Sequence, residues 1–217
     1  MRLVLASNNA KKLIELQALL APVGVELVAQ GRLGVAEAEE PHHSFIENAL
    51  AKARHAAHAA GGAALADDSG LCVAALGGAP GVISAHFAPI TLPDAEREVQ
   101  RGVQDAANNR LLLERLGNVD DRRAHFISTL VALRSAEDPE PLIAVGRWFG
   151  VILREPRGSG GFGYDPLLFI PALGTSVAML DAGAKNAHSH RALATRQMCG
   201  LLRDVWHLGQ VNGATAA

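Results

Sequence analysis

The sequence predicts an α/β protein with a mixed β-sheet flanked by helices. Two observations support this class. Short apolar runs alternate with helical patterns in the first part of the chain, and β-like segments then cluster between residues 123 and 153. At 217 residues the chain is long enough to bury a substantial core. We expect one two-lobed domain over residues 1–208 and a flexible tail at 209–217.

Strands and helices alternate in the N-terminal part of the chain. Ser44 and Glu47 form a capping box that opens an Ala-rich helix. The elements predicted up to that helix are a strand at 2–6, a helix at 10–24, a strand at 25–30 and the Ala-rich helix at 44–60. A further strand is expected to end at Asp67 and Asp68, which we interpret as an acidic turn.

The middle of the chain carries alternating and β-branched residues, and "RSAEDPEP" is typical of a hairpin loop. The remaining predicted elements are a helix at about 94–116, β-segments at 123–133 and 141–153, a short strand at 167–170 and a last helix at about 190–207.

Composition excludes several protein classes. With 49% hydrophobic and 19% charged residues, the chain has the profile of a soluble globular protein. A net charge of -2 argues against broad nucleic-acid binding, and no apolar run is long enough to span a membrane. Cys72 and Cys199 are interpreted as buried free thiols in a reduced compartment. The start "MRLVLASNNAKK" turns polar too soon for a secretory signal, so we expect a cytoplasmic protein.

The stretch "SNNAKK" links the first strand to the first helix. Ser7, Asn8 and Asn9 are good N-cap residues, and a helix start with Lys11 or Lys12 beside it attracts anions. The alternative is a plain N-cap with solvated lysines. The stretch lacks the glycine run of a Walker loop.

Acidic residues occur in two places. Asp67 and Asp68, followed by Ser69, interrupt an apolar stretch, and burying such charges costs several kcal/mol unless cations or donors compensate. With an acid from the loop around Glu39, such carboxylates hold Mg²⁺ and orient or deprotonate water. The alternatives are an acidic turn that caps a strand and a solvated acidic loop.

A third group lies in "GSGGFGYDP" and "AKNAHSHR". The first stretch satisfies G-x-G-x-x-G, but a strand follows it where a dinucleotide site requires a helix. Phe162 offers a ring for stacking, Asp165 an acceptor, and Lys185, His190 and Arg191 donors. The histidines do not have the spacing of a zinc site.

Taken together, these segments resemble the inosine triphosphate pyrophosphatase family, in particular its bacterial XTP/dITP pyrophosphatases. The resemblance extends to about Leu202. It rests on six stretches in the family order: "LASNNAKKLIEL", "SFIENALAKARHAA", "ADDSGL", "GGAPGVISA", "GGFGYDPLLF" and "KNAHSHR".

The resemblance implies a long twisted sheet, two lobes with a nucleotide cleft between them, and a homodimer. It also implies Mg²⁺-dependent hydrolysis of the non-standard nucleotides ITP, dITP and XTP to the monophosphate and pyrophosphate. By motif position, Glu39 and Asp68 are the metal ligands and Asp68 is also the general base. The substrate-binding residues would be Ser7, Asn8, Asn9, Ala10, Lys11, Lys12, Ser69, Phe162, Gly163, Tyr164, Asp165, Lys185, His190 and Arg191.

The chemistry of the residues agrees with this substrate class. A 6-oxopurine presents an acceptor at O6, to which Lys185 or Arg191 can donate. It also presents a donor at N1, from which Asp165 can accept. Adenine would leave such groups unpaired. The chain departs from the family at His86 and Phe87, where arginine and tyrosine are usual. A related pyrophosphatase for other modified nucleotides and a non-catalytic nucleotide sensor remain as alternatives.

Overall fold

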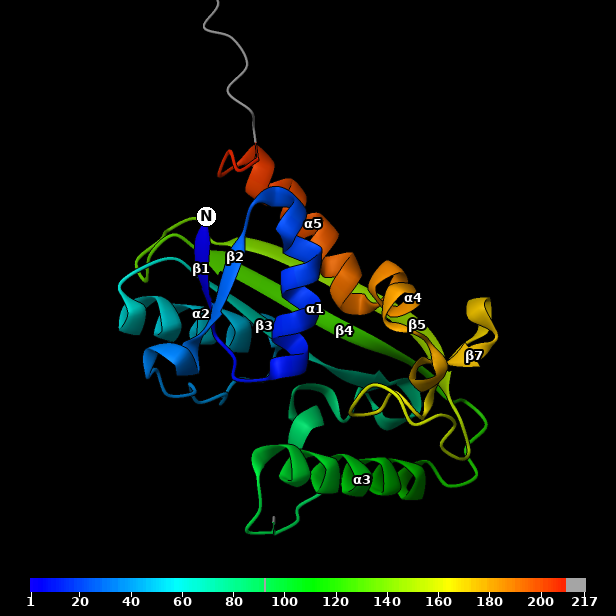
Figure 1. The fold of residues 1–217 in the computed structure, drawn as a ribbon. Coiled ribbons are helices and arrows are strands. Elements are labelled where there is room, and N and C mark those ends of the chain that lie inside the picture. Colours follow the sequence, from blue (N-terminus) through cyan, green and yellow to red (C-terminus); the bar gives the residue numbers. More distant parts are fainter. Residues whose placement is uncertain (92, 210–217) are drawn as a thin grey trace, which may run out of the picture. The chain divides into compact units, whose positions relative to one another are not determined.

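In a computed structural model of the protein, which describes residues 1–91 and 93–209, seven strands form one mixed sheet (Figure 1). Their order is β2-β1-β3-β4-β5-β6-β7. β1 pairs in parallel with both β2 and β3, whereas β5–β6 and β6–β7 are antiparallel. Helices flank the sheet, so the predicted fold class is confirmed.

The strands are β1 (Arg2–Leu5), β2 (Glu26–Ala29), β3 (Ala64–Val73), β4 (Arg123–Leu133), β5 (Leu142–Ile152), β6 (Leu168–Ile170) and β7 (Thr175–Ser176). The α-helices are α1 (Ala10–Leu20), α2 (Phe45–Ala60), α3 (Arg97–Leu116), α4 (Ala182–His188) and α5 (His190–Asp204). Short 3₁₀ segments, such as η4 (Gly81–His86), connect several of them. No helix of the described chain has the length and apolar character that crossing a membrane requires.

The chain divides into two compact units. The first contains Met1–Asp68, Ser128–Gly146 and the described chain from His190 onward, and the second contains Ser69–Ile127 and Arg147–Ser189. Each boundary between the units falls inside β3, β4 or β5, or between α4 and α5.

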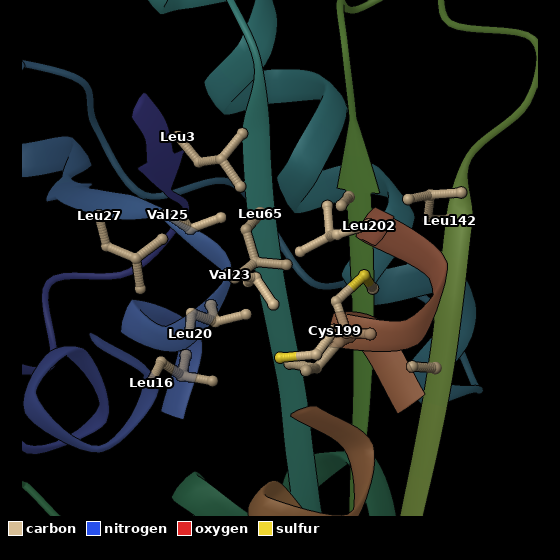
Figure 2. Packing of buried hydrophobic residues seen from close by; sticks show 14 of the residues in the cluster. Leu3, Leu16, Leu20, Val23, Val25, Leu27, Leu65, Leu142, Cys199 and Leu202 are labelled. Carbon is tan, nitrogen blue, oxygen red and sulfur yellow. The ribbon is translucent and has the colours of Figure 1, made fainter. Parts of the chain in front are cut away.

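Side chains alternate along β1, so the sheet of the first unit has apolar side chains on both faces. Helices cover both of these faces. Leu3 and Leu5 pack against α1 and α5, which lie side by side, whereas Val4 packs against α2. Figure 2 shows the first of these clusters, in which leucines of α1 and α5 meet the strands. The small side chains of α2 facing the sheet, among them Ala49, Ala53 and Ala56, are fully buried and allow close packing.

The core of the second unit forms between one sheet face and α3. Leu112 and Leu116 of α3 are fully buried with Leu71, Phe126 and Trp148 of the strands. Leu112 and Leu116 are four residues apart and therefore lie on the same face of α3.

One sequence prediction about the fold is wrong. β3 does not end in an acidic turn before Asp67, since it runs without interruption from Ala64 through both acids to Val73. Strand alternation therefore points the two neighbouring carboxylates to opposite faces, which relieves the repulsion that the sequence implied. Helix α4 and strand β7 were not predicted. The predicted tail at 209–217 lies, apart from Gly209, outside the described residues.

Candidate active site

The loop before α1 is organised by its own polar side chains. Asn9 is the N-cap of α1, and its side chain accepts from the backbone N–H groups of Lys11 and Lys12 at 3.0 and 3.2 Å. Ser7 Oγ accepts from the Asn9 N–H, and Asn8 Oδ1 accepts from the Gly31 N–H at 2.8 Å. The loop is thus held in one shape, with Lys11 exposed and Lys12 partly buried.

Asp67 is the centre of a buried charge cluster in the first unit. Its side chain is 1% exposed, and its Oδ2 lies 3.0 Å from Arg191 Nε and 3.2 Å from Lys12 Nζ. Ser128 Oγ donates to its Oδ1 at 2.8 Å. Burial opposes its charged form, but Arg191, Lys12 and the Ser128 hydroxyl together hold the pKa of Asp67 well below its usual range. Asp67 is therefore an ionised structural anchor.

Arg191 joins this cluster from the first turn of α5. It is 1% exposed, and its Nη1 donates to Glu15 Oε2 of α1 while its Nε donates to Asp67. A cation at a helix N-terminus is unfavourable by itself. These two carboxylates compensate it and raise the pKa of Arg191 although burial opposes its charge. The structure thus gives Arg191 two protein anions as partners, and its role toward a substrate base stays a prediction.

Asp68 points to the α2 side of the sheet and meets a different cation. Lys52 Nζ lies 2.7 Å from Asp68 Oδ1 and 3.3 Å from Glu40 Oε2, and it also donates to the Asp67 carbonyl at 3.3 Å. Burial raises the pKa of Asp68 to about 6, against the opposing effect of Lys52. Burial also disfavours the charge on Lys52, but the carboxylates of Asp68 and Glu40 outweigh it and raise its pKa. A carboxylate with a pKa close to neutral suits a general base.

The second carboxylate oxygen of Asp68 is a candidate ligand for a metal ion. Oδ2 is buried and has no hydrogen-bond partner within the described residues, so it can serve as a metal ligand. No three His, Cys, Asp or Glu side chains of residues 1–91 and 93–209 gather around a point where they would hold an ion by themselves. Mg²⁺, which keeps waters and takes substrate phosphate oxygens, is compatible with so few protein ligands.

The acidic loop brings Glu40 into an ion pair with Lys52, the partner of Asp68. Glu39 is exposed and makes no ion pair or hydrogen bond within the described part of the chain. Its role as a metal ligand stays a prediction.

Phe162, Asp165 and Lys185 form a second group, which lies in the second unit. Lys185 Nζ is 2.9 Å from Asp165 Oδ2 and 4.6 Å from the centre of the Phe162 ring. The same Asp165 oxygen accepts from the Phe162 N–H at 3.0 Å. Asp165 and Lys185 are both buried, and their ion pair joins a residue of "GSGGFGYDP" to one of "AKNAHSHR". The role of these residues toward a purine base stays a prediction.

The loop around this second group is tightly packed. A Cβ at Gly161 would lie 2.0 Å from Asp165 Oδ2, and the φ of +76° at Gly161 favours glycine. Tyr164 is buried, and its hydroxyl donates to the Ser84 carbonyl at 2.9 Å. Burial and the charge of Asp105 raise the pKa of Tyr164, so the hydroxyl stays a donor. Tyr164 therefore anchors the loop with its side chain turned inward.

For three other predicted residues, the structure gives a location and a degree of burial. Ala10 is exposed at the start of α1, Ser69 is half-buried at the beginning of the second unit's part of β3, and His190 is buried at the start of α5. Phe87, which departs from the family pattern, is buried with the Arg115 guanidinium 5.1 Å from its ring centre.

Sequence reasoning missed Lys52 and Glu40. A signal for Lys52 was present, since it lies at helical spacing from Asn48, Ala49 and Ala56 on the face of α2 that is buried. A lysine on the buried face of a helix requires a carboxylate partner. Glu40 offered no such signal because it stands in a run of exposed acids.

Comparisons with known proteins agree with these motifs. A model of the Ham1 family matches residues 3–201. A protein named dITP/XTP pyrophosphatase from Methylibium petroleiphilum is 70% identical over 206 residues, which are 95% of this chain and 99% of that protein. One of the same name from Leptothrix cholodnii is 68% identical, over 96% and 100% of the two chains. The solved structure of a HAM1 protein from Coxiella burnetii matches with a TM-score of 0.83 and 42% identity, over 94% of this chain and all of that one.

Proposed function

Because the chain belongs to the Ham1 family, we propose that it is a nucleoside triphosphate pyrophosphatase. It hydrolyses dITP, XTP and ITP to the monophosphate and pyrophosphate, and so removes non-standard purine nucleotides from the pool. The family membership confirms the resemblance that the six motifs indicated. The relatives named dITP/XTP pyrophosphatase support the substrate class.

The loop of residues 7–12, with Lys12, and the buried Lys52 of α2 handle the phosphates. A triphosphate carries about four negative charges near neutral pH, and phosphoryl transfer depends mostly on positioning and charge neutralisation. Lys52 is fixed by Asp68 and Glu40, and Lys12 by Asp67, so both ammonium groups are placed before substrate binds. Such preorganisation reduces the cost of reorganisation during the reaction.

Asp68 is the general base. It accepts a proton from the attacking water, whose oxygen forms a bond to phosphorus while the α–β phosphoanhydride bond breaks and pyrophosphate leaves. Lys52 holds one carboxylate oxygen, which leaves Oδ2 as the oxygen that acts on water or metal. Its pKa near neutrality allows it both to accept the proton and to release it afterwards.

As a member of this family, the protein is a metal-dependent hydrolase, and we infer that the metal is Mg²⁺. Asp68 Oδ2 and the acidic loop with Glu39 would hold it. When bound, Mg²⁺ neutralises phosphate charge. The support for this assignment is the orphaned oxygen of Asp68 and the preference of Mg²⁺ for carboxylates and phosphates.

The second unit recognises the base. Phe162 stacks on the purine, and the buried pair of Asp165 and Lys185 provides an acceptor for N1–H and a donor for O6. Adenine has the opposite pattern at these positions and leaves both partners unsatisfied, which is how polar pockets discriminate strongly. Ser69, Gly163, Tyr164, His190 and Arg191 complete the set of residues that we propose around the nucleotide.

We further propose that the protein is a homodimer and that it works in the cytoplasm. The first part follows from the family, and the second from the two free cysteines and the composition.

The single observation that carries the proposed function is Asp68: a buried carboxylate held by Lys52, whose second oxygen has no donor among the described residues. The test is the product and rate with ITP, dITP, XTP and the four standard triphosphates, each with Mg²⁺. We expect pyrophosphate from the first three at rates well above those for ATP. Equal rates on ATP and ITP would contradict the proposal.

A further inference from the structure

Helix α3 carries two polar side chains that form hydrogen bonds with the backbone of the loop of residues 162–165. Asp105 Oδ2 accepts from the Gly163 N–H at 2.7 Å, and Asn109 Nδ2 donates to the Gly163 carbonyl at 2.9 Å. The two side chains are four residues apart and so lie on one face of the helix. The backbone N–H and C=O of Gly163 are thus both bound by one turn of α3. Asn109 and Asp105 precede Gly163 by 54 and 58 residues in the sequence.

Gly163 is the residue of this loop that most needs such support. Its φ is +62°, in the left-handed region, and it lies directly after Phe162 and two residues before Asp165. Glycine in such a conformation is permitted but not enforced, because glycine has many accessible conformations. The orientations of the peptide groups before and after Gly163 determine the positions of the Phe162 ring and the Asp165 carboxylate.

The support on α3 is rigid. Ala107, Leu112 and Leu116 of this 20-residue helix are buried in the core of the second unit. The preceding polar pair, Gln104 and Asn108, binds the carbonyls of Ser84, Ala85 and Ala88 in the same way. A hydrogen bond to the ionised carboxylate of Asp105 is shorter and stronger than one between neutral groups. The helix therefore acts as a fixed frame for two neighbouring segments.

We propose that Asp105 and Asn109 are positioning residues for base selectivity, which they control by fixing the peptide groups of Gly163. This rests on the proposed function, since it assigns base recognition to Phe162, Asp165 and Lys185. Neither residue needs to touch the substrate. Their effect is transmitted through two backbone hydrogen bonds to side chains that are one and two residues away.

The kinetic test uses Asp105→Ala and Asn109→Ala, with Asp105→Asn as the conservative variant that keeps an acceptor for Gly163. Arg110→Ala is the matched control, because Arg110 is exposed on the same helix next to Asn109. The readout is the ratio of kcat/KM for dITP to that for dATP, which does not depend on the fraction of folded enzyme. We expect this ratio to fall about tenfold in both alanine variants, from the loss of one hydrogen bond each. Asp105→Asn should retain most of it.

A merely structural role would lower kcat/KM for both nucleotides equally and leave the ratio unchanged, which would overturn the proposal. Full loss of selectivity in Arg110→Ala would also overturn it, because that side chain does not contact the loop in any described hydrogen bond.

A second measurement separates this proposal from the proposed function. In ligand-free protein labelled with ¹⁵N-glycine, we expect hydrogen exchange at the Gly163 amide to be about tenfold faster in Asp105→Ala than in the wild type. Unchanged exchange would contradict the positioning role whatever the substrate is. Faster exchange, with a wild type that shows no preference for dITP, would instead contradict the proposed function alone.

Discussion

The two units place their polar groups by different physical means. In the first unit, Asp67 and Asp68 are buried on opposite faces of one strand. Asp67 pairs with Lys12 of α1 and Arg191 of α5, and Asp68 pairs with Lys52 of α2. In the second unit, the loop of residues 162–165 is placed mainly by hydrogen bonds to backbone groups, together with the buried ion pair of Asp165 and Lys185.

This difference indicates which property each unit controls. Removing one partner of a buried ion pair leaves an uncompensated charge and costs about 3–5 kcal/mol, so changes in the first unit act on the whole fold or on the chemistry. Removing a side chain that forms a hydrogen bond with a loop lowers the free energy of unfolding by about 1–3 kcal/mol. It also changes the position of the loop. We therefore expect changes in the second unit to act on substrate choice.

The largest effect is expected from Asp68→Asn. The amide keeps an acceptor for Lys52, which also keeps Glu40 as its anionic partner, so the melting temperature should change little. The amide has no basic oxygen, so kcat for dITP should fall by about 10³-fold. Steady-state kinetics and thermal unfolding check this. The fully exposed Asp120 supplies the matched control Asp120→Asn, which should leave kcat as in the wild type. A near-normal kcat in Asp68→Asn would show that Asp68 is not the base.

Asp67→Asn is expected to lower the stability of the fold, whereas Asp68→Asn is expected to lower kcat. The change leaves the charges of Arg191 and Lys12 without their common partner, so the free energy of unfolding should fall by about 3–5 kcal/mol. Urea denaturation followed by circular dichroism measures it. If Asp67→Asn is as stable as the wild type, the assignment of Asp67 as a structural anchor is wrong.

Gly161→Ala tests the packing of the second unit. Its Cβ would displace the Asp165 carboxylate, so KM for dITP should rise about tenfold while kcat changes less. Gly174→Ala is the control, because Gly174 has a similar φ of +63° and no atom within 4 Å of its Cβ position. An equal rise of KM in both variants would mean that backbone strain, and not Asp165, is responsible.

The smallest effect is expected at His125, whose ring lies 5.2 Å from that of Phe149. Burial, with Arg147, lowers its pKa below the ordinary value of 6.5. The unfolded chain then binds the proton more readily, so stability is lost as the pH falls below about 6.5. In His125→Gln the loss of unfolding free energy between pH 8 and pH 5 should shrink by less than about 1 kcal/mol, since solvent screens this partly buried ring.

A larger loss in His125→Gln than in the wild type would contradict the direction of the pKa shift.

The periodic elements of the fold followed from the sequence because their side chains repeat with the period of the element. The strand at 123–133 and the helix beginning after Ser44 were predicted at the bounds that β4 and α2 have. The course of β3 through Asp67 and Asp68 was not predictable in this way. Two adjacent acids predict a turn unless their partners are known, and these partners, Lys12, Lys52 and Arg191, lie far away in the chain.

The candidate site was predictable where motifs carry it and not where tertiary contacts complete it. Phe162, Asp165 and Lys185 were chosen from their residue types, and the structure brings them together. Asp105 and Asn109 carry no signal in the sequence, because polar residues on a helix are normally solvated. Their partners are the backbone groups of a glycine, which no side-chain pattern reveals.

We propose that the first unit carries out hydrolysis of the α–β phosphoanhydride bond of a 6-oxopurine triphosphate. ³¹P NMR of dITP with the wild-type protein and Mg²⁺ tests it most directly, since it identifies the first phosphorus-containing products. We predict that dIMP and pyrophosphate appear together in equal amounts, and that neither forms at a comparable rate with Asp68→Asn. Orthophosphate with dIDP as the first products would contradict the account.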